Sequence, residues 1–219
     1  RLTRYLSPPL FPVRLRDLPC RLVLHDVPLG ALDVDGLQVL CAPVTHPGPT
    51  VGYRISDGRR SIAYIPDHEP ALGARRFPPP PQWTSGYAVA AGADLLIHDT
   101  QYTGAEYAAH EGWGHSTMEH ALAFARLARV KRLVTFHHDP SHSDAMLDEL
   151  HDQARRIGRL PFELIPGMEG ARFERVLEEI LQHPDQIKAD PGHEGGFPAD
   201  LDARIVEEQD RLRLAHGCH

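Results

Sequence analysis

Hydrophobic and polar positions form short alternating or apolar runs along the first part of the chain, and these runs predict β-strands. Strands are expected at Cys20–Val27 and Leu37–Val44, separated by a turn cluster of glycine and aspartate at 30–36. Two further runs, Thr50–Ser56 and Ser61–Ile65, flank an Asp-Gly dipeptide that is typical of a tight hairpin turn. We therefore expect this part of the chain to form a sheet.

From residue 94 the pattern changes, and strand-like runs alternate with stretches of helical periodicity. Ser116 opens the clearest helix, because Glu119 follows at the spacing of a capping box and apolar side chains then recur at helical intervals. Further helices are expected at Ala105–Ala109 and Ser143–Ile157. The strands expected here are Asp94–Asp99, Arg132–Phe136, Phe162–Ile165 and Ala171–Phe173. This order of elements predicts an α/β (α+β) fold in which helices pack on sheets.

Composition divides the chain into two parts. Residues 1–174 are expected to form the folded domain, and residues 175–219 a linker with a C-terminal helical extension. Residues 183–197 are rich in proline, glycine and charge, as linkers are. A helix over Asp200–Leu214 would have only a sparse apolar stripe and would need a partner. We expect it to dock on the core, to mediate a homodimer or to begin a further domain.

Charge and cysteine content narrow the class of protein. The net charge is −7 and the isoelectric point is near 6.1, which argues against a broad nucleic-acid-binding face. The three cysteines are widely spaced without a C-x-x-C pair, so neither a disulfide framework nor a thiolate zinc site is supported. No apolar run is long enough to cross a membrane. We expect a cytoplasmic protein that has no membrane partner and acts on a small-molecule substrate rather than on nucleic acid.

Several histidines and aspartates follow predicted strands or precede a predicted helix. His46, Asp67 and His137 follow strand-like runs, and Asp99 ends one. His115 lies directly before the predicted helix, where the helix dipole should lower its pKa. Taken alone, each also has a structural explanation, such as an exposed turn histidine, a capping aspartate or a buried core histidine. The last four histidines of the chain and those at 110, 120, 142 and 151 are expected to be exposed or without a role.

Taken together, these residue types suit a metal-dependent hydrolase. Imidazole and carboxylate bind zinc, manganese or iron, and a carboxylate can bridge two such ions. Bridged ions would polarise a phosphoryl oxygen and deliver a hydroxide nucleophile at neutral pH. His115 could then protonate the leaving oxygen as a general acid.

The ordered set of motifs resembles the metallo-β-lactamase superfamily, in particular its tRNA 3′-processing endonuclease and cyclic-nucleotide phosphodiesterase branch. The resemblance covers roughly residues 20 to 173. The matching stretches are Thr45–Arg54, Tyr64–Asp67, Asp94–Thr100, Gly114–Thr117 and Leu133–Pro140. The resemblance implies an αββα sandwich with two divalent metal ions, zinc above all, at one edge of two packed sheets.

The resemblance also implies a role for each matching residue. His46 is similar to a single-histidine ligand of one metal, Asp67 to the bridging aspartate and His137 to the last ligand of the second metal. His115 resembles the proton-donating histidine, and Asp99 the acidic residue that orients it. His137 is preferred to His138 as the ligand because Pro140 then falls where the family has a small residue or proline.

The chain departs from the family in one respect. The H-x-H-x-D-H loop, which supplies four further metal ligands, is not among these 219 residues. We interpret the chain as the later part of the fold, with that loop encoded upstream. Three ligands spread over two sites hold metal poorly, so the fragment alone is expected to be inactive.

The leading hypothesis is hydrolysis of phosphodiesters, with a small or cyclic-nucleotide-like substrate preferred to tRNA. The acidic balance and the lack of a long basic insertion between Asp67 and Asp94 motivate this preference. A second hypothesis is hydrolysis of an ester, lactone or thioester, with an apolar site around Ser7–Pro12 and Phe77–Trp83. A third is a non-catalytic binding module whose tail recruits partners.

Overall fold

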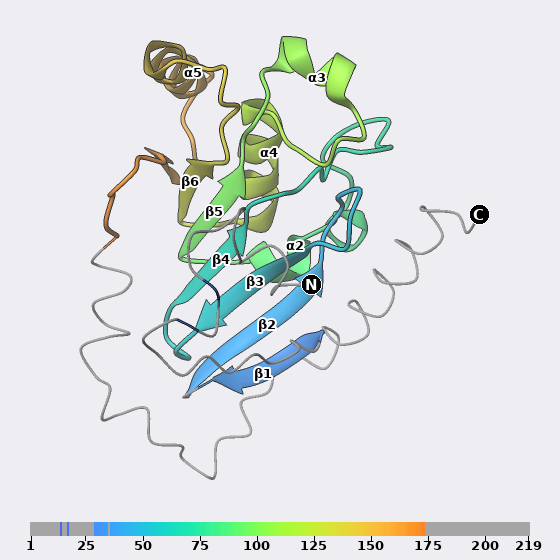
Figure 1. Ribbon diagram of the computed structural model, residues 1–219, viewed down its shortest axis with the longest axis vertical. Coiled ribbons are helices and arrows are strands. Elements are labelled where there is room, and N and C mark those ends of the chain that lie inside the picture. The colour runs from blue at the N-terminus through green and yellow to red at the C-terminus, as the bar shows by residue number, and fades with distance from the viewer. Residues whose placement is uncertain (1–13, 15–16, 18–28, 35, 174–219) are drawn as a thin grey trace.

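The structure is a computed structural model that describes residues 14, 17, 29–34 and 36–173. Its strands form one seven-stranded mixed sheet, in which the order of the strands in space is their order in the chain (Figure 1). Strands β1 to β4 pair antiparallel, whereas β4 to β7 pair parallel. The strands are β1 (Gly30–Val34), β2 (Leu37–Pro43), β3 (Val51–Ser56), β4 (Ser61–Ile65), β5 (Leu95–Asp99), β6 (Arg132–Phe136) and β7 (Glu163–Pro166).

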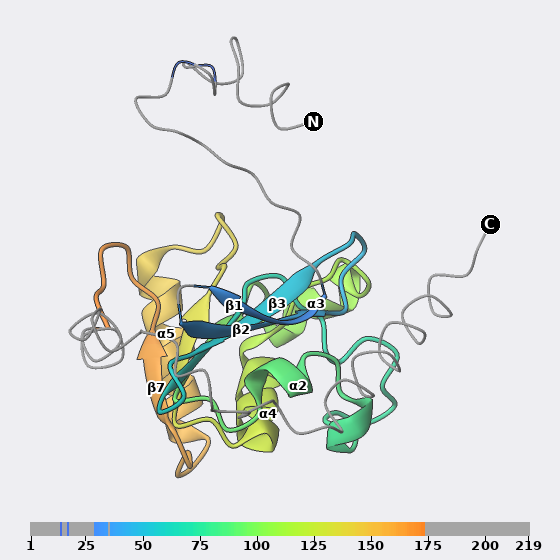
Figure 2. The ribbon, with the colours of Figure 1, turned by 90° about the horizontal axis from the view of Figure 1, so that it is seen from below.

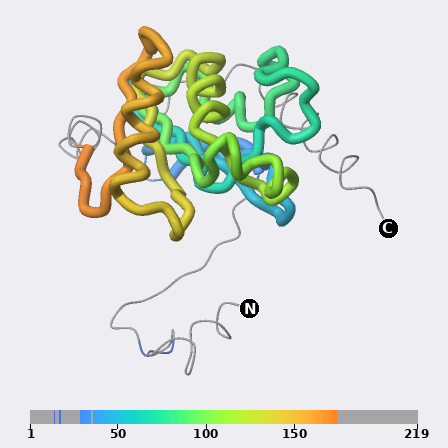
Figure 3. Tube along the Cα trace, turned by 90° about the horizontal axis from the view of Figure 1, so that it is seen from above, coloured from blue at the N-terminus to red at the C-terminus, as the bar shows by residue number. Residues whose placement is uncertain are grey.

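Helices connect the parallel strands, because a parallel pair needs a crossover rather than a tight turn. The helices are η2 (Pro81–Trp83), α2 (Tyr87–Ala90), α3 (Gly104–His110), α4 (Met118–Ala128) and α5 (Asp144–Arg156). Helices α2, α4 and α5 cover one face of the sheet, as the two turned views show (Figures 2 and 3). The described residues thus form two layers, a sheet and its helices.

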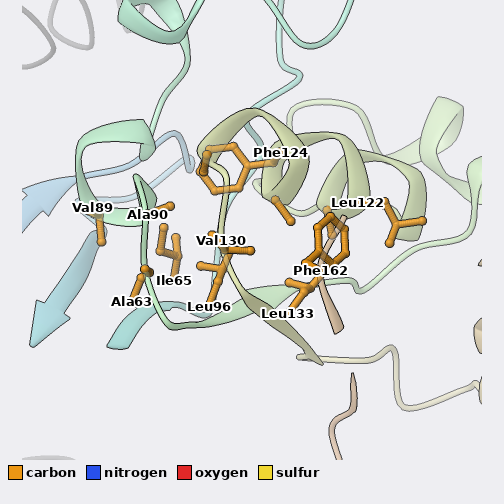
Figure 4. Close-up of a cluster of buried hydrophobic side chains, with 14 of the residues drawn as sticks. Ala63, Ile65, Val89, Ala90, Leu96, Leu122, Phe124, Val130, Leu133 and Phe162 are labelled. Carbon is orange, nitrogen blue, oxygen red and sulfur yellow. The ribbon is translucent and has the colours of Figure 1, made fainter. Parts of the chain in front are cut away.

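The main core lies between the sheet and these helices. Leu96 and Leu133 of the central strands are fully buried under Phe124 and Leu122 of α4 (Figure 4). The stripe predicted for this helix is buried throughout. Its members are Met118, Ala121, Leu122, Ala125 and Ala128. Burial of this stripe, more than intrinsic propensity, stabilises the helix.

The opposite face of the sheet carries a smaller apolar cluster, formed around Ile62, Leu95 and Val134. Phe136 and Phe173 help to line a cavity of about 510 Å³ beside it. An αββα sandwich has a second sheet against this face. Among the described residues there is one sheet, so they make up one αβ half of that architecture.

Most of the predicted elements are confirmed, and two predictions are wrong. The predicted turn at 30–36 is strand β1 over most of its length, paired with β2 from Gly30↔Cys41 to Val34↔Leu37. Pairing with a neighbour decides its conformation, and Gly36 closes the turn by donating its N–H to the Asp33 side chain at 3.0 Å.

The second wrong prediction is the strand at Ala171–Phe173, which is irregular in the structure. The predicted strand at Cys20–Val27, the predicted linker at 183–197 and the predicted helix at Asp200–Leu214 lie outside the described residues. None of the helices in the described part of the chain is long and apolar enough to cross a membrane.

Candidate metal centre

The predicted site residues meet at one edge of the sheet. Asp67 follows β4, Asp99 ends β5 and His137 follows β6, and these strands run parallel. Strand β2 points the same way as β4, because each pairs antiparallel with β3. The loop after β2 therefore brings His46 to this edge as well. Carboxyl ends of neighbouring strands are the usual position of a site in such sheets.

His46 is oriented by its own loop. Its Nδ1 lies 2.9 Å from the Thr50 hydroxyl and 3.2 Å from the backbone N of Gly48. The Thr50 hydroxyl donates to the Gly48 carbonyl, so its oxygen can accept a proton from Nδ1. In that tautomer Nε2 carries the lone pair available to a ligand. Gly114 packs directly on this ring, and a Cβ at Gly114 would overlap His46 Cδ2 and Pro47 Cδ. The position of the His46 ring thus depends on a glycine 68 residues later in the chain.

The donor atoms of this edge are close enough to one another for metal binding. Ligand atoms of His46, Asp67 and His115 all lie within 4.8 Å of one another, as do those of Asp99, His115 and His137. Asp67 Oδ1 lies 3.4 Å from His137 Nε2. Two ligands of one zinc ion are at most about 4.2 Å apart, since each bond is about 2.1 Å long. Each group therefore fits a divalent ion in kind and nearly in spacing; His115 belongs to both groups, whereas His46 and His137 fall in different ones.

His137 adopts a backbone conformation that the sequence does not predict. Its φ is +57°, in the left-handed region that residues other than glycine seldom occupy. This turn after β6 directs its ring toward His115, on which it stacks with ring centroids 5.0 Å apart. The neighbouring His138 is instead 3.3 Å from the Thr100 hydroxyl. The structure thus places His137, and not His138, beside Asp67.

Asp99 anchors His115. Its carboxylate is fully buried and accepts hydrogen bonds from His115 Nδ1 at 2.6 Å and from the backbone N–H of Ser116 at 3.0 Å. It also accepts from the N–H groups of Gln101 and His68. The carboxylate is therefore held in one orientation, and Nε2 of His115 is the ring nitrogen left for substrate.

The predicted direction of the His115 pKa shift is wrong. Burial opposes protonation of this ring most strongly, but the hydrogen bond and charge of Asp99, together with Asp67 and Glu69, outweigh it. The pKa of His115 is therefore raised, not lowered. The carboxylate of Asp99 raises this pKa more than the helix dipole lowers it, because Asp99 carries a full negative charge at hydrogen-bond distance.

The predicted capping box of the following helix is also wrong. Thr117, not Ser116, caps α4, and its hydroxyl accepts the N–H of His120 at 3.1 Å. The Ser116 hydroxyl donates instead to the carbonyl of His68 at 2.7 Å. Ser116 thus serves the site, where its N–H is already bonded to Asp99, and the helix begins one residue later.

Glu69 is a structural residue of the site that sequence reasoning missed. Its side chain is fully buried and accepts the Tyr107 hydroxyl at 2.8 Å and the N–H groups of Gly112 and Gly114. Burial, then the hydrogen bond to Glu69, raises the pKa of Tyr107. Glu69 thereby fixes the loop that presents His115. Its position beside Asp67 was the only signal in the sequence.

The four histidines at 110, 120, 142 and 151, which were expected to be exposed, are at least partly buried. His151 is 3% exposed and lies 2.9 Å from the Thr135 hydroxyl, and the His142 ring is 3.0 Å from Glu106. His110 stacks on Tyr102, and His120 packs edge-on against Phe77. Helix and loop packing, which periodicity alone does not reveal, buries these rings.

The chain matches a known protein family and two curated relatives. Residues 9–138 match the model described as the Beta-lactamase superfamily domain. The chain is similar to Ribonuclease Z of Anoxybacillus flavithermus, at 27% identity over 150 residues, which are 63% of this chain and 46% of the relative. It is also similar to Ribonuclease Z of Gemmatimonas aurantiaca, at 37% identity over 94 residues, or 43% of this chain and 29% of the relative.

A solved structure supports the same fold. The metallo-beta-lactamase fold protein YhfI from Bacillus subtilis aligns with a TM-score of 0.50 and 18% identity, over 64% of this chain and 51% of that chain. The present chain spans less than half the length of the two Ribonuclease Z relatives. The family match over residues 9–138 spans the site residues from His46 to His137.

Proposed function

The chain belongs to the metallo-β-lactamase superfamily, and on this premise we propose that the protein is a metal-dependent hydrolase of phosphodiesters that prefers small, cyclic-nucleotide-like substrates. One observation carries the proposal. The pair formed by Asp99 and His115 lies among the donor atoms of His46, Asp67 and His137. A proton donor beside a metal-binding group is the arrangement that phosphodiester hydrolysis needs.

In this proposal His46, Asp67 and His137 hold divalent metal, zinc in the first place, with manganese or iron as substitutes. Such ions, when bound, polarise the phosphoryl group and lower the pKa of a bound water. Nε2 of His46 is available because Nδ1 is engaged by its own loop. Asp67 would serve both ions, and its ligand atoms support this role by lying within 4.8 Å of a His46 nitrogen and 3.4 Å from His137 Nε2.

His115 is proposed as the general acid. Nδ1 is held by Asp99, so a proton on Nε2 faces the substrate side. Asp99 also stabilises the cationic ring, which keeps a proton available for the leaving oxygen. Asp99 itself accepts from neighbouring backbone N–H groups, which fix its carboxylate, so its role is to orient His115.

Two substrate classes compete, and each has an observation behind it. The net charge of −7 favours a small substrate over a long polyanion. The similarity to Ribonuclease Z favours RNA as the second candidate. For the ester, lactone or thioester alternative, the predicted apolar site is described only in its second half. Phe77 packs on the core and on His120, whereas Ser7–Pro12 lies outside the described residues.

A substrate panel tests the proposal. The full-length protein, loaded with zinc or manganese, would be assayed on a cyclic nucleotide, a nitrophenyl phosphodiester, a precursor tRNA, a lactone and a thioester. We expect turnover of the two small phosphodiesters. Turnover of precursor tRNA alone would replace the small-substrate preference, and turnover of the acyl substrates alone would replace the phosphodiester class. Binding of two equivalents of transition metal by the full-length protein would rule out the binding-module alternative.

The same panel assigns the acid. Nitrophenolate leaves without protonation, whereas a ribose oxygen needs a proton. We therefore expect His115→Gln to lower kcat on the cyclic nucleotide by about 10²- to 10⁴-fold and on the nitrophenyl diester much less. His110→Gln is the control, since His110 lies outside the donor groups. Equal losses on both substrates would contradict the role of His115.

A further inference from the structure

We infer that His68, His98 and Ser85 are positioning residues, which form a hydrogen-bonded chain that holds the loop bearing His46 in place relative to Asp99. The inference rests on the proposed function only in taking His46 and Asp99 as parts of a metal centre. None of the three residues offers a ligand atom to either donor group. They act on the site only through hydrogen bonds to Thr45 and Asp99.

The direction of each hydrogen bond follows from one end of the chain. His98 Nδ1 lies 2.8 Å from the carbonyl oxygen of Asp99, which can only accept, so this nitrogen carries the proton. In the neutral ring, Nε2 of His98 is then an acceptor. His68 Nδ1 lies 2.9 Å from it and must donate. Both rings are thereby assigned to the tautomer protonated at Nδ1.

The other end of the chain continues in the same direction. His68 Nε2 is left as an acceptor and receives the Ser85 hydroxyl proton at 3.1 Å. The Ser85 oxygen in turn accepts the backbone N–H of Thr45 at 2.8 Å. Every ring nitrogen and the hydroxyl are satisfied with no charged group in the chain. Thr45 directly precedes His46, so the chain joins the metal-ligand loop to Asp99.

Complete burial gives this chain its stiffness. Both rings are 0% exposed, and each packs against the ring of Phe124 in α4. An unpaired polar atom at such a depth costs roughly 1–3 kcal/mol, so loss of one link is not repaired by water. The rings also leave little space, because a Cβ at Gly86 would lie 2.8 Å from His68 Cε1. The chain therefore has a single satisfied arrangement.

The chain sets the spacing of parts that are distant in sequence. Thr45 is bound at its N–H by Ser85 and at its carbonyl by the N–H of Glu69. Asp99 is bound through its carbonyl by His98 and through its carboxylate by His115. Without the Ser85 link, the His46 loop keeps only the Glu69 hydrogen bond on this side. Its ligand nitrogen would then be less firmly placed for metal.

Zinc affinity and histidine tautomers of the full-length protein test the inference. Ser85→Ala removes the hydroxyl that bonds both Thr45 and His68. Thr84→Ala is the matched control, because that neighbouring hydroxyl is equally buried but donates only to the carbonyls of Pro79 and Pro80. Melting curves would establish that both variants fold. Zinc affinity would be measured by competition with a chelator.

We expect zinc affinity to fall about 10- to 100-fold in Ser85→Ala and to change less than about twofold in Thr84→Ala, as for loss of an outer partner of a metal site. Nitrogen NMR of the wild type should show His68 and His98 neutral and protonated at Nδ1. Equal zinc affinity in the two variants, or either ring protonated at Nε2, would overturn the inference.

The two proposals fail separately. If the substrate panel shows no phosphodiester turnover but Ser85→Ala weakens zinc binding, the proposed function is wrong and the positioning chain stands. If turnover is observed and Ser85→Ala binds zinc like Thr84→Ala, the function stands and the positioning chain is wrong.

Discussion

At the scale of single residues, the candidate site depends on contacts that bring backbone close to a ring. Gly114 lies against His46, and its N–H donates to Glu69 at 2.7 Å. Its φ of +94° and the lack of a side chain are both required there. Gly112 has a similar φ of +85° and also donates to Glu69, but a Cβ there would meet nothing within 4 Å. Substitution of Gly112 would therefore cause backbone strain alone, whereas substitution of Gly114 would cause strain and also displace His46.

The pair gives a testable prediction. Gly114→Ala should lower zinc affinity at least about tenfold, because the new methyl group displaces the His46 ring. Gly112→Ala should cost only the strain of a left-handed alanine, about 1–2 kcal/mol of unfolding free energy, and keep zinc affinity. Chelator competition and urea unfolding of both variants measure the two quantities. Equal zinc loss in both variants would show that His46 is not displaced in the way the packing implies.

At the scale of elements, the site is held by strand ends and by the layer beneath them. Arg54 of β3 ties the sheet to the segment around α2, because its guanidinium donates to the carbonyls of Val89 and Ala91 and to the Ser61 hydroxyl. Burial lowers the pKa of Arg54 despite the charge of Asp94. Helix α2 is a single turn, so the hydrogen bonds from Arg54 are a main constraint on its position.

Replacement of this guanidinium should destabilise the protein. We expect Arg54→Lys to lower the unfolding free energy by about 2 kcal/mol, because an ammonium group cannot reach three acceptors in a fixed fork. Arg59→Lys, at the exposed hairpin turn, is the control and should change it by less than about 0.5 kcal/mol. Urea unfolding of the two variants measures the difference. Equal stability of both would mean that the fork at Arg54 contributes nothing net.

At the scale of the whole molecule, buried neutral histidines link stability to pH. Burial, as the largest cause in each case, lowers the pKa of five rings. These are His68, His98, His120, His138 and His151. His115 is the opposite case, since Asp99 raises its pKa. Among the described histidines with a shifted pKa, five are thus lowered and one is raised.

The sign of the pH dependence follows. Below about pH 6.5 the unfolded chain binds protons at these five rings that the native state does not bind. The unfolding free energy therefore decreases as the pH is lowered. His115 stabilises the native state below about pH 6.5 and offsets part of this loss. We expect a lower unfolding free energy at pH 5.5 than at pH 7.5, by up to about 1.4 kcal/mol per lowered group and pH unit below 6.5.

Urea unfolding with a chelator present would measure this slope without metal. His151→Gln should reduce the slope, because one of the five rings is then gone. Unchanged or greater stability at pH 5.5 would mean that the buried rings accept protons in the native state.

Local pattern was sufficient for most elements. The hairpin of β3 and β4, the strands β5 and β6, and helix α5 follow from periodicity and turn residues, which act over a few neighbours. The order of the motifs was sufficient to select His46, Asp67 and His137, because the ends of parallel strands meet at one edge of the sheet. Their roles as ligands stay predictions until metal binding is measured.

Tertiary structure alone decided how these residues are held. Contacts between segments 16 to 48 residues apart bury His68, His98 and Glu69, raise the pKa of His115 and bind Ser116 to the site. The strand at 30–34 likewise exists through pairing rather than through its own pattern. Tertiary packing determines hydrogen bonds and burial between segments that are distant in the chain. The local pattern of hydrophobic and polar residues does not predict which side chains make these contacts.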